Sequence, residues 1–195
     1  IEVGGTALHE QAVAFGFQAE EEDAEAEELE VPLPVVPSFA PDEGQDRNIL
    51  GRAGIGQSNV ESSPLQMAMV AAGIANSGEV MRPYLVESVR DSDMSVVTQA
   101  SPGSYSQATS ASTAQMLTEM MTLVPQEGGS GTNGAIPGID VAGKTGTAET
   151  GEGRATHNWF IGFAPADDPQ IAVAIVIEHG GGSGNENAAP IARQM

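Results

Sequence analysis

The chain has 195 residues, of which 40% are hydrophobic, so it is long enough to bury one sizeable core in one or two domains. Its 27 acidic residues outnumber the seven basic ones and give a formal charge of −20. This charge would repel nucleic-acid phosphates and anionic lipid headgroups, so we expect no nucleic-acid partner. Strong acidity also favours solubility at high ionic strength, and a salt-adapted source is a hypothesis that follows from it.

Three further features of the sequence limit its interpretation. The absence of cysteine excludes disulfides and thiolate metal sites. No stretch reaches the roughly 18 uninterrupted apolar residues that a membrane helix needs. The chain opens on Ile1 rather than on a start methionine and a signal region, so we expect it to be part of a larger protein.

The N-terminal quarter contains one expected helix followed by an insertion. Apolar residues spaced by three and four predict an amphipathic helix from Gly5 to Phe17, ended by Gly16. Eight of the eleven residues from Glu20 to Glu30 are acidic, and like charges at this density resist compaction. Prolines at 32, 34, 37 and 41 follow. We therefore expect an acidic, Pro-rich surface loop at about residues 18–48 that ends in an extended strap.

The middle of the chain predicts two helices and a strand. Ser63 can cap a buried helix that starts at Pro64 and ends before Gly78. The segment from Val80 to Arg90 is predicted as a short strand. A second amphipathic helix is predicted from Ser110 to Val124.

The C-terminal part predicts a small antiparallel sheet. A Gly-rich loop from Gly128 to Gly138 precedes three apolar runs, which we interpret as adjacent strands at Val141–Ala148, Trp159–Ala164 and Ile171–Glu178. Residues 165–170 have the polar, Pro-containing composition of a hairpin turn. Residues 180–184 are expected to form a turn, and residues 187–195 to begin a helix.

The sequence Lys144-Thr145-Gly146-Thr147 lies on the first of these strands. Alternation places the side chains of Lys144 and Gly146 on one face and those of Thr145 and Thr147 on the other. Glycine in a strand interior permits close approach of a backbone or a ligand. A cation and two hydroxyls along one strand suit an anionic ligand. Taken alone, however, a Lys-Thr-Gly triplet occurs by chance in many proteins, and a strand lysine is usually only solvated.

The context of the triplet resolves this ambiguity. Lys-Thr-Gly is the third element of the serine β-lactamase and penicillin-binding protein signature. In this chain it is followed by Thr147-Ala148-Glu149, by the segment from His157 to Pro165, and by the apolar strand from Ile171 to Glu178. It is preceded, in order, by Gly54-Ile55-Gly56-Gln57, Ser63-Pro64-Leu65-Gln66, Ile74-Ala75-Asn76-Ser77-Gly78 and Met81-Arg82-Pro83-Tyr84. This succession resembles the C-terminal half of class B penicillin-binding proteins, the monofunctional peptidoglycan transpeptidases.

Two shorter motifs narrow the resemblance within this family. They are Ala12-Val13-Ala14-Phe15-Gly16-Phe17 and Gly134-Ala135-Ile136-Pro137-Gly138, and they are similar to the penicillin-binding protein A group of actinobacteria. The resemblance implies an α+β fold of the serine transpeptidase and β-lactamase type, with an antiparallel sheet packed between helices. Residues 1–195 would be the C-terminal part of the transpeptidase domain, with the motif on an edge strand beside the active-site cleft.

The resemblance also implies roles for the motif residues. Lys144 and Thr145 would help to bind the terminal carboxylate of the substrate, with Lys144 shaping the field around the nucleophile. Thr147 would contribute its hydroxyl to that carboxylate and its backbone N–H to the oxyanion hole, and Gly146 would line the same site. Such a donor is typically worth a few kcal/mol of barrier. Catalytic roles thus fall on Lys144 and Thr147.

The chain departs from the family pattern because it lacks a Ser-x-x-Lys sequence and a suitably placed Ser-x-Asn. The nucleophile and its base are therefore expected upstream of Ile1. The implied reaction is D,D-transpeptidation of a peptidoglycan stem peptide through an acyl-serine intermediate, with inhibition by β-lactams. Two alternatives stay open: a D,D-carboxypeptidase or β-lactamase of the same fold, and a non-catalytic penicillin-binding sensor or scaffold.

Other candidate residues and partners complete the sequence-based hypothesis. The amide of Gln57 would hold a peptide stem or stabilise its own turn, and both readings are open. His157 would contact substrate, although a loop-exposed histidine is the favoured interpretation. The three histidines show no metal spacing, so we expect neither a metal nor a cofactor. The family implies cell-division or elongation proteins as partners and a place outside the cytoplasmic membrane, behind an upstream anchor helix.

Overall fold

The structure is a computed structural model that describes residues 3–18, 31, 34–40, 46–58 and 60–195. The acidic run of residues 20–30 lies outside these ranges, as does most of the predicted insertion. Of the expected strap, Ser38 and Ala40 are buried. Phe39 forms isolated β-bridges with Gln18 and Glu61, so this part of the chain is attached to the body of the protein.

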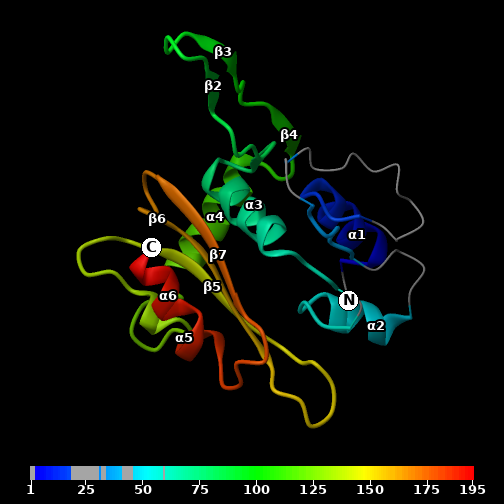
Figure 1. The fold of residues 1–195 in the computed structure, drawn as a ribbon. Coiled ribbons are helices and arrows are strands. Elements are labelled where there is room, and N and C mark those ends of the chain that lie inside the picture. The colour runs from blue at the N-terminus through cyan, green and yellow to red at the C-terminus, as the bar shows by residue number, and fades with distance from the viewer. Residues whose placement is uncertain (1–2, 19–30, 32–33, 41–45, 59) are drawn as a thin grey trace.

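A three-stranded antiparallel sheet carries the Lys-Thr-Gly motif (Figure 1). Its strands are β5 (Ala142–Ala148), β6 (His157–Ala164) and β7 (Ile171–Ile177), in the order β5-β6-β7. All three predicted strands are therefore confirmed. The turn between β6 and β7 is closed by the N–H of Gln170, which donates to the carbonyl of Ala164 at 3.0 Å.

Helices cover both faces of this sheet, as the fold class predicted (Figure 1). On one face lie α3 (Pro64–Ala75) and α4 (Ala111–Thr122), whose buried side chains form a core with the sheet at Ile74, Met121, Ala142 and Phe163. On the other face, α5 (Gly184–Asn187) and α6 (Ala189–Gln194) surround Phe160, which is 1% exposed, with Ala188, Ala189 and Ala192. Side chains on opposite faces of β6 therefore pack into two separate hydrophobic cores.

The helix α3 begins where the sequence predicted. The hydroxyl of Ser63 accepts from the N–H of Gln66 at 3.2 Å and so caps the helix. Gln66 itself is buried, and its Nε2 donates to the carbonyl of Phe15 at 2.6 Å. This bond fixes the end of α1 (Gly5–Ala14), where Gly16 has a φ of +101°. The buried glutamine therefore joins two helices that are far apart in sequence.

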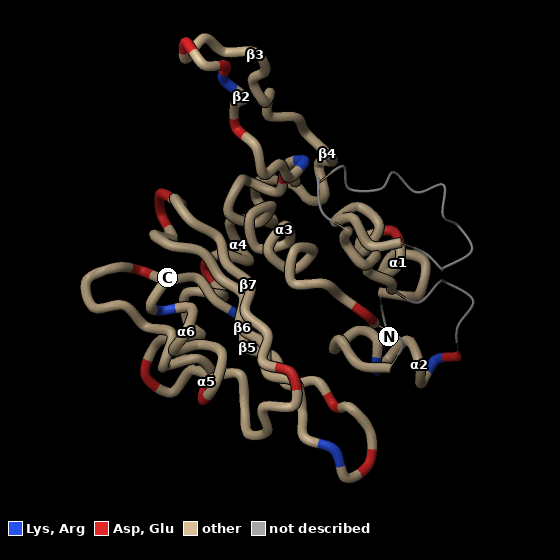
Figure 2. Tube along the Cα trace, viewed as in Figure 1, with Lys and Arg blue, Asp and Glu red and all other residues tan. Residues whose placement is uncertain are grey.

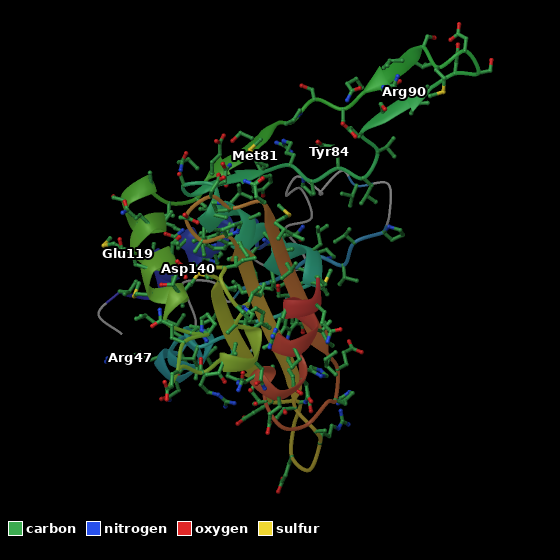
Figure 3. The ribbon with its side chains drawn as sticks, turned by 90° about the vertical axis from the view of Figure 1, so that its left-hand side faces the viewer. Arg47, Met81, Tyr84, Arg90, Glu119 and Asp140 are labelled. Carbon is green, nitrogen blue, oxygen red and sulfur yellow. The ribbon has the colours of Figure 1, made fainter. Side chains whose placement is uncertain are left out.

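The strand predicted from Val80 to Arg90 is wrong, because the segment divides between two sheets. Its start belongs to β1 (Glu79–Met81), which pairs with β4 (Ser104–Gln107), and its end to β2 (Ser88–Arg90), which pairs with β3 (Val96–Gln99). Pro83 lies between them and has no N–H to donate, so the ladder cannot continue through it. In Figure 3 the β2–β3 hairpin projects from the body, with Tyr84 near its base and Arg90 along it.

Three other elements differ in detail from the expectation. The predicted Gly-rich loop contains a short 3₁₀ helix, η1 (Thr132–Gly134). Residues 180–183 are non-helical, as expected of a turn, and the expected C-terminal helix divides into the two short helices α5 and α6, of which α5 already begins at Gly184. A further short helix, α2 (Arg47–Ala53), precedes the turn that contains Gln57. No helix in the described part of the chain is long and apolar enough to cross a membrane.

Candidate active site

The motif lies on β5, which is an edge strand because the described residues pair it only with β6. Lys144 lies opposite Ile161, and Thr145 lies opposite Phe160. Since Phe160 packs under α5 and α6, Thr145 and Thr147 share that face, whereas Lys144 and Gly146 share the α3 face. The predicted alternation along the motif is therefore confirmed.

Lys144 is the only lysine in the sequence. Its side chain is exposed, and its Nζ donates to the carbonyl of Thr145 at 2.6 Å. Figure 2 shows acidic residues spread over many elements of the protein and few basic ones among them. A lysine at this one position thus places an ammonium group at the exposed edge of the sheet, where it can meet an anion.

Thr145 is held by a residue that the sequence analysis missed. Its Oγ1 lies 3.0 Å from the Oγ of Ser130. Ser130 belongs to the predicted Gly-rich loop, and the adjacent Gly131 lies so close to the sheet that an added Cβ would be 3.2 Å from the Thr145 methyl group. The glycine run was the only sequence signal for this approach. The contact fixes the rotamer of the first motif threonine.

Gly146 is contacted from two sides. An added Cβ would lie 3.1 Å from the Cβ of Trp159, which is its partner on β6. The second contact comes from Gly184, the first residue of α5. An added Cβ at Gly184 would lie 2.8 Å from the carbonyl oxygen of Gly146. The side chains of Ser183 and Glu186 form a capping box that fixes the start of α5. The absence of a side chain at Gly184 therefore allows the start of α5 to pack directly on the backbone of the motif strand.

Gln57 contacts the free edge of β5. Its Nε2 donates to the carbonyl of Thr147 at 3.2 Å, and its Oε1 accepts from the N–H of Glu149 at 3.4 Å. In an antiparallel strand, the N–H and C=O of one residue point to the same edge. Because the Thr147 carbonyl faces Gln57 and not β6, the Thr147 N–H also faces the open edge. This is the direction that the expected oxyanion role requires.

His157 is not the loop-exposed residue that the sequence favoured. It is the first residue of β6, lies opposite Ala148 and is half-buried. Its Nδ1 accepts from the backbone N–H of His179 at 2.9 Å, and the two rings meet edge to face with centroids 4.6 Å apart. The hydrogen bond leaves Nε2 as the protonated nitrogen of the neutral ring, so His157 can act as a donor.

All six predicted site residues line one cleft of about 830 Å³ between the sheet and the turn after α2. They are Gln57, Lys144, Thr145, Gly146, Thr147 and His157. The cleft also includes Arg154, from the β5–β6 loop, and the serines at 58 and 62. Within the ranges that the structure describes, no group of three or more His, Asp or Glu side chains could hold a metal ion. Besides the Lys144 ammonium group and several hydroxyls, the lining of the cleft contains the Arg154 guanidinium group, two imidazoles and three carboxylates.

Comparison with known proteins supplies the decisive observation. Residues 39–195 match the family model described as the penicillin binding protein transpeptidase domain. The chain belongs to this family. It is 41% identical, over 96% of its length, to the peptidoglycan D,D-transpeptidase PbpA of Mycolicibacterium smegmatis, and 38% identical, over 100%, to PbpA of Mycobacterium tuberculosis. The expected likeness to the penicillin-binding protein A group is thus confirmed.

Solved structures agree with the fold. The structure of penicillin-binding protein A from M. tuberculosis, as a ceftriaxone acyl-enzyme complex, superposes with a TM-score of 0.83 at 38% identity, covering 96% of this chain and 41% of that one. The D,D-transpeptidase domain of a peptidoglycan glycosyltransferase from Eggerthella lenta gives 0.79 at 36% identity, covering 98% and 46%. This chain spans 40% of the M. smegmatis relative and 39% of the M. tuberculosis relative.

Proposed function

We propose that the chain forms the substrate-binding half of a serine D,D-transpeptidase domain that cross-links peptidoglycan. The observation that carries the proposal is the edge of β5, where Lys144, the Thr147 N–H and the cleft residue Gln57 come together in one cleft. Relatives named as peptidoglycan D,D-transpeptidases support the same conclusion. The chain is proposed to be the C-terminal part of that domain, together with the acidic insertion at about residues 18–48.

In the proposed reaction, a serine upstream of Ile1 attacks the carbonyl of the terminal D-Ala-D-Ala bond of a stem peptide. The bond to the terminal D-alanine breaks, its nitrogen takes up a proton, and D-alanine leaves. An acceptor amine from a neighbouring peptidoglycan strand then attacks the acyl-serine carbonyl; the new amide bond forms, the ester bond to serine breaks, and a proton from the amine passes to the serine oxygen. A β-lactam would acylate the same serine and block it.

Each motif residue takes a role that its position permits. Lys144 would meet the terminal carboxylate with its ammonium charge, helped by the hydroxyl groups of Thr145 and Thr147. The N–H of Thr147, which faces the open edge, would donate to the oxyanion as it forms. Removing one such preorganised donor typically costs about 10²–10³ in rate. Gly146 would give the substrate backbone access, while His157 would donate from Nε2 at the far end of the cleft.

The surroundings of the protein follow from this substrate. Peptidoglycan lies outside the cytoplasmic membrane, so we place the domain there, anchored by a helix that is not in this chain. Its partners would be the stem peptide, β-lactam antibiotics, the upstream part of the same protein, and cell-division or elongation proteins.

The test is labelling of the intact protein, including the sequence that precedes Ile1, with a fluorescent penicillin. We expect one labelled serine upstream of Ile1, located by peptide mass spectrometry, and an acylation rate that falls about 10²-fold or more in Lys144→Ala. The matched control is Arg90→Ala, which removes the same unit of charge from the projecting hairpin and should change little. Label on a serine within the 195 residues would refute the assignment of the nucleophile.

Two rival functions give different results in the same system. With a stem peptide as donor, a transpeptidase needs an acceptor amine to form its product, whereas a carboxypeptidase or β-lactamase releases product to water alone. A protein that binds penicillin reversibly, without a covalent label, would be a sensor or scaffold.

A further inference from the structure

The free edge of β5 is already occupied by a side chain of the protein itself. Gln57 offers a primary amide, and both halves of that amide are in use: Nε2 donates to the Thr147 carbonyl, and Oε1 accepts from the Glu149 N–H. These two backbone groups lie two residues apart on the same edge, as the alternation of an antiparallel strand requires. Gln57 thus takes the donor and acceptor positions that an added peptide strand would use.

We propose that Gln57 is a built-in competitor for the peptide-binding edge, which the acyl donor must displace before it can bind in extended form. The inference rests on the proposed function, because it assigns Gln57 a role at the same substrate site. It differs from the expectation that Gln57 holds the stem peptide, since an amide that is already bonded to the edge cannot also present the same groups to a ligand.

The geometry allows the side chain to leave without disturbing its turn. The backbone N–H of Gln57 donates to the carbonyl of Arg52 at 3.0 Å, so the main chain is fixed independently of the side chain. The side-chain distances of 3.2 and 3.4 Å lie at or beyond the long end of the N–H···O range, which indicates weak bonds. A rotation about side-chain torsions would therefore release the Thr147 and Glu149 groups.

The competition affects different classes of ligand unequally. A donor with an amide N–H beside its reactive carbonyl can replace Gln57 at the Thr147 carbonyl and recover the lost bond. A donor without that amide does not displace Gln57, so its rate of acylation should not change when the Gln57 side chain is removed. Gln57 would thus slow the binding of peptide-like acyl donors, which must displace it, and leave donors without that amide unaffected.

The test compares two penicillins in the intact protein. Penicillin G carries an acylamino group on its bicyclic ring, and penicillanic acid is the same ring without that substituent. Acylation by each is measured at low concentration, by competition with a fluorescent penicillin. Gln57→Ala removes the competitor, and Gln57→Asn keeps an amide that is one methylene too short to span both groups. The matched control is Gln170→Ala, whose Nε2 donates to the Asp168 carbonyl in the β6–β7 turn.

We expect both Gln57 variants to be acylated roughly three- to tenfold faster by penicillin G, as the loss of one or two weak hydrogen bonds predicts. Acylation by penicillanic acid should stay within about twofold of the wild-type rate, and the control should change neither. Unchanged or slower acylation by penicillin G would overturn the inference, and slower acylation would make Gln57 a substrate-binding residue. Equal acceleration by both compounds would also overturn it. If the wild-type protein takes no covalent label, the proposed function fails first and the inference falls with it.

Discussion

Replacing Gly184 by Ala tests whether the start of α5 sets the position of the motif. A Cβ at residue 184 would lie 2.2 Å from the Trp159 carbonyl oxygen and 2.8 Å from the Gly146 carbonyl oxygen. Both neighbours are backbone atoms of adjacent strands, so neither can turn aside as a flexible side chain would. Either α5 must withdraw or β5 must move, by about 1 Å, to restore an ordinary contact.

The size of the effect follows from that displacement. Overpacking of this kind costs about 1–3 kcal/mol of unfolding free energy. Because Gly146 precedes Thr147 directly, a shift of about 1 Å at the proposed oxyanion donor would lower the acylation rate by up to about 10²-fold. We expect both effects in the intact protein, measured by chemical denaturation and by the rate of labelling with a fluorescent penicillin.

A second glycine provides the control for Gly184→Ala. Gly51 lies within α2, and an added Cβ there would meet nothing within 4 Å. Gly51→Ala should therefore leave acylation unchanged and raise helix stability by about 0.5–1 kcal/mol. If Gly184→Ala were as stable and as quickly acylated as the wild type, α5 would not hold the motif strand in place.

Three further predictions concern stability, pH and salt. Ser63→Ala removes the cap of α3 and should cost about 1 kcal/mol in denaturant unfolding, while a Ser63→Asn variant should retain most of it. The backbone N–H of Ser95 donates to Asp93 and lowers the pKa of that carboxyl. The stability that this bond gives the hairpin turn should therefore be fully present above the ordinary carboxyl pKa and be lost as pH falls through the lowered value. An NMR titration of Asp93 checks this. The rate of acylation by the anionic penicillin G, relative to that by the zwitterionic ampicillin, should rise from low to moderate salt. The reason is that the 27 acidic residues outnumber the seven basic ones and repel anions at long range, which salt screens. A fall in the relative rate would mean that the field of Lys144 dominates.

The central sheet and its main helix were predictable because their patterns are local. Strands β6 and β7 are continuous apolar runs with β-branched and aromatic residues, since both are covered by helices. Helix α3 carries its own start signal in Ser63-Pro64. The motif on β5 was found by its residue order, and its place on an edge strand followed from the resemblance to the family.

The missed elements depend on partners that are distant in sequence. The residues of β4 are polar and partly exposed, and the strand exists because it pairs with β1 across the hairpin arm. The contact of Ser130 with Thr145, and that of Gly184 with Gly146, arise where loops fold back on the sheet. No spacing in the sequence encodes which loop glycine will meet which strand. The direction of the Gln57 amide was left open for the same reason.

The composition of the chain also bears on the meaning of Lys144. A strand lysine in an ordinary protein is one of many, and its presence on a surface says little about function. Here the other six basic residues are arginines, and the single lysine lies in the cleft. An ammonium group is a compact point charge, whereas a guanidinium group is a planar fork that demands more space and a fixed approach. The proposed role of the single lysine, at the edge where a carboxylate is proposed to bind, would therefore depend on the shape of its charge as well as on the sign.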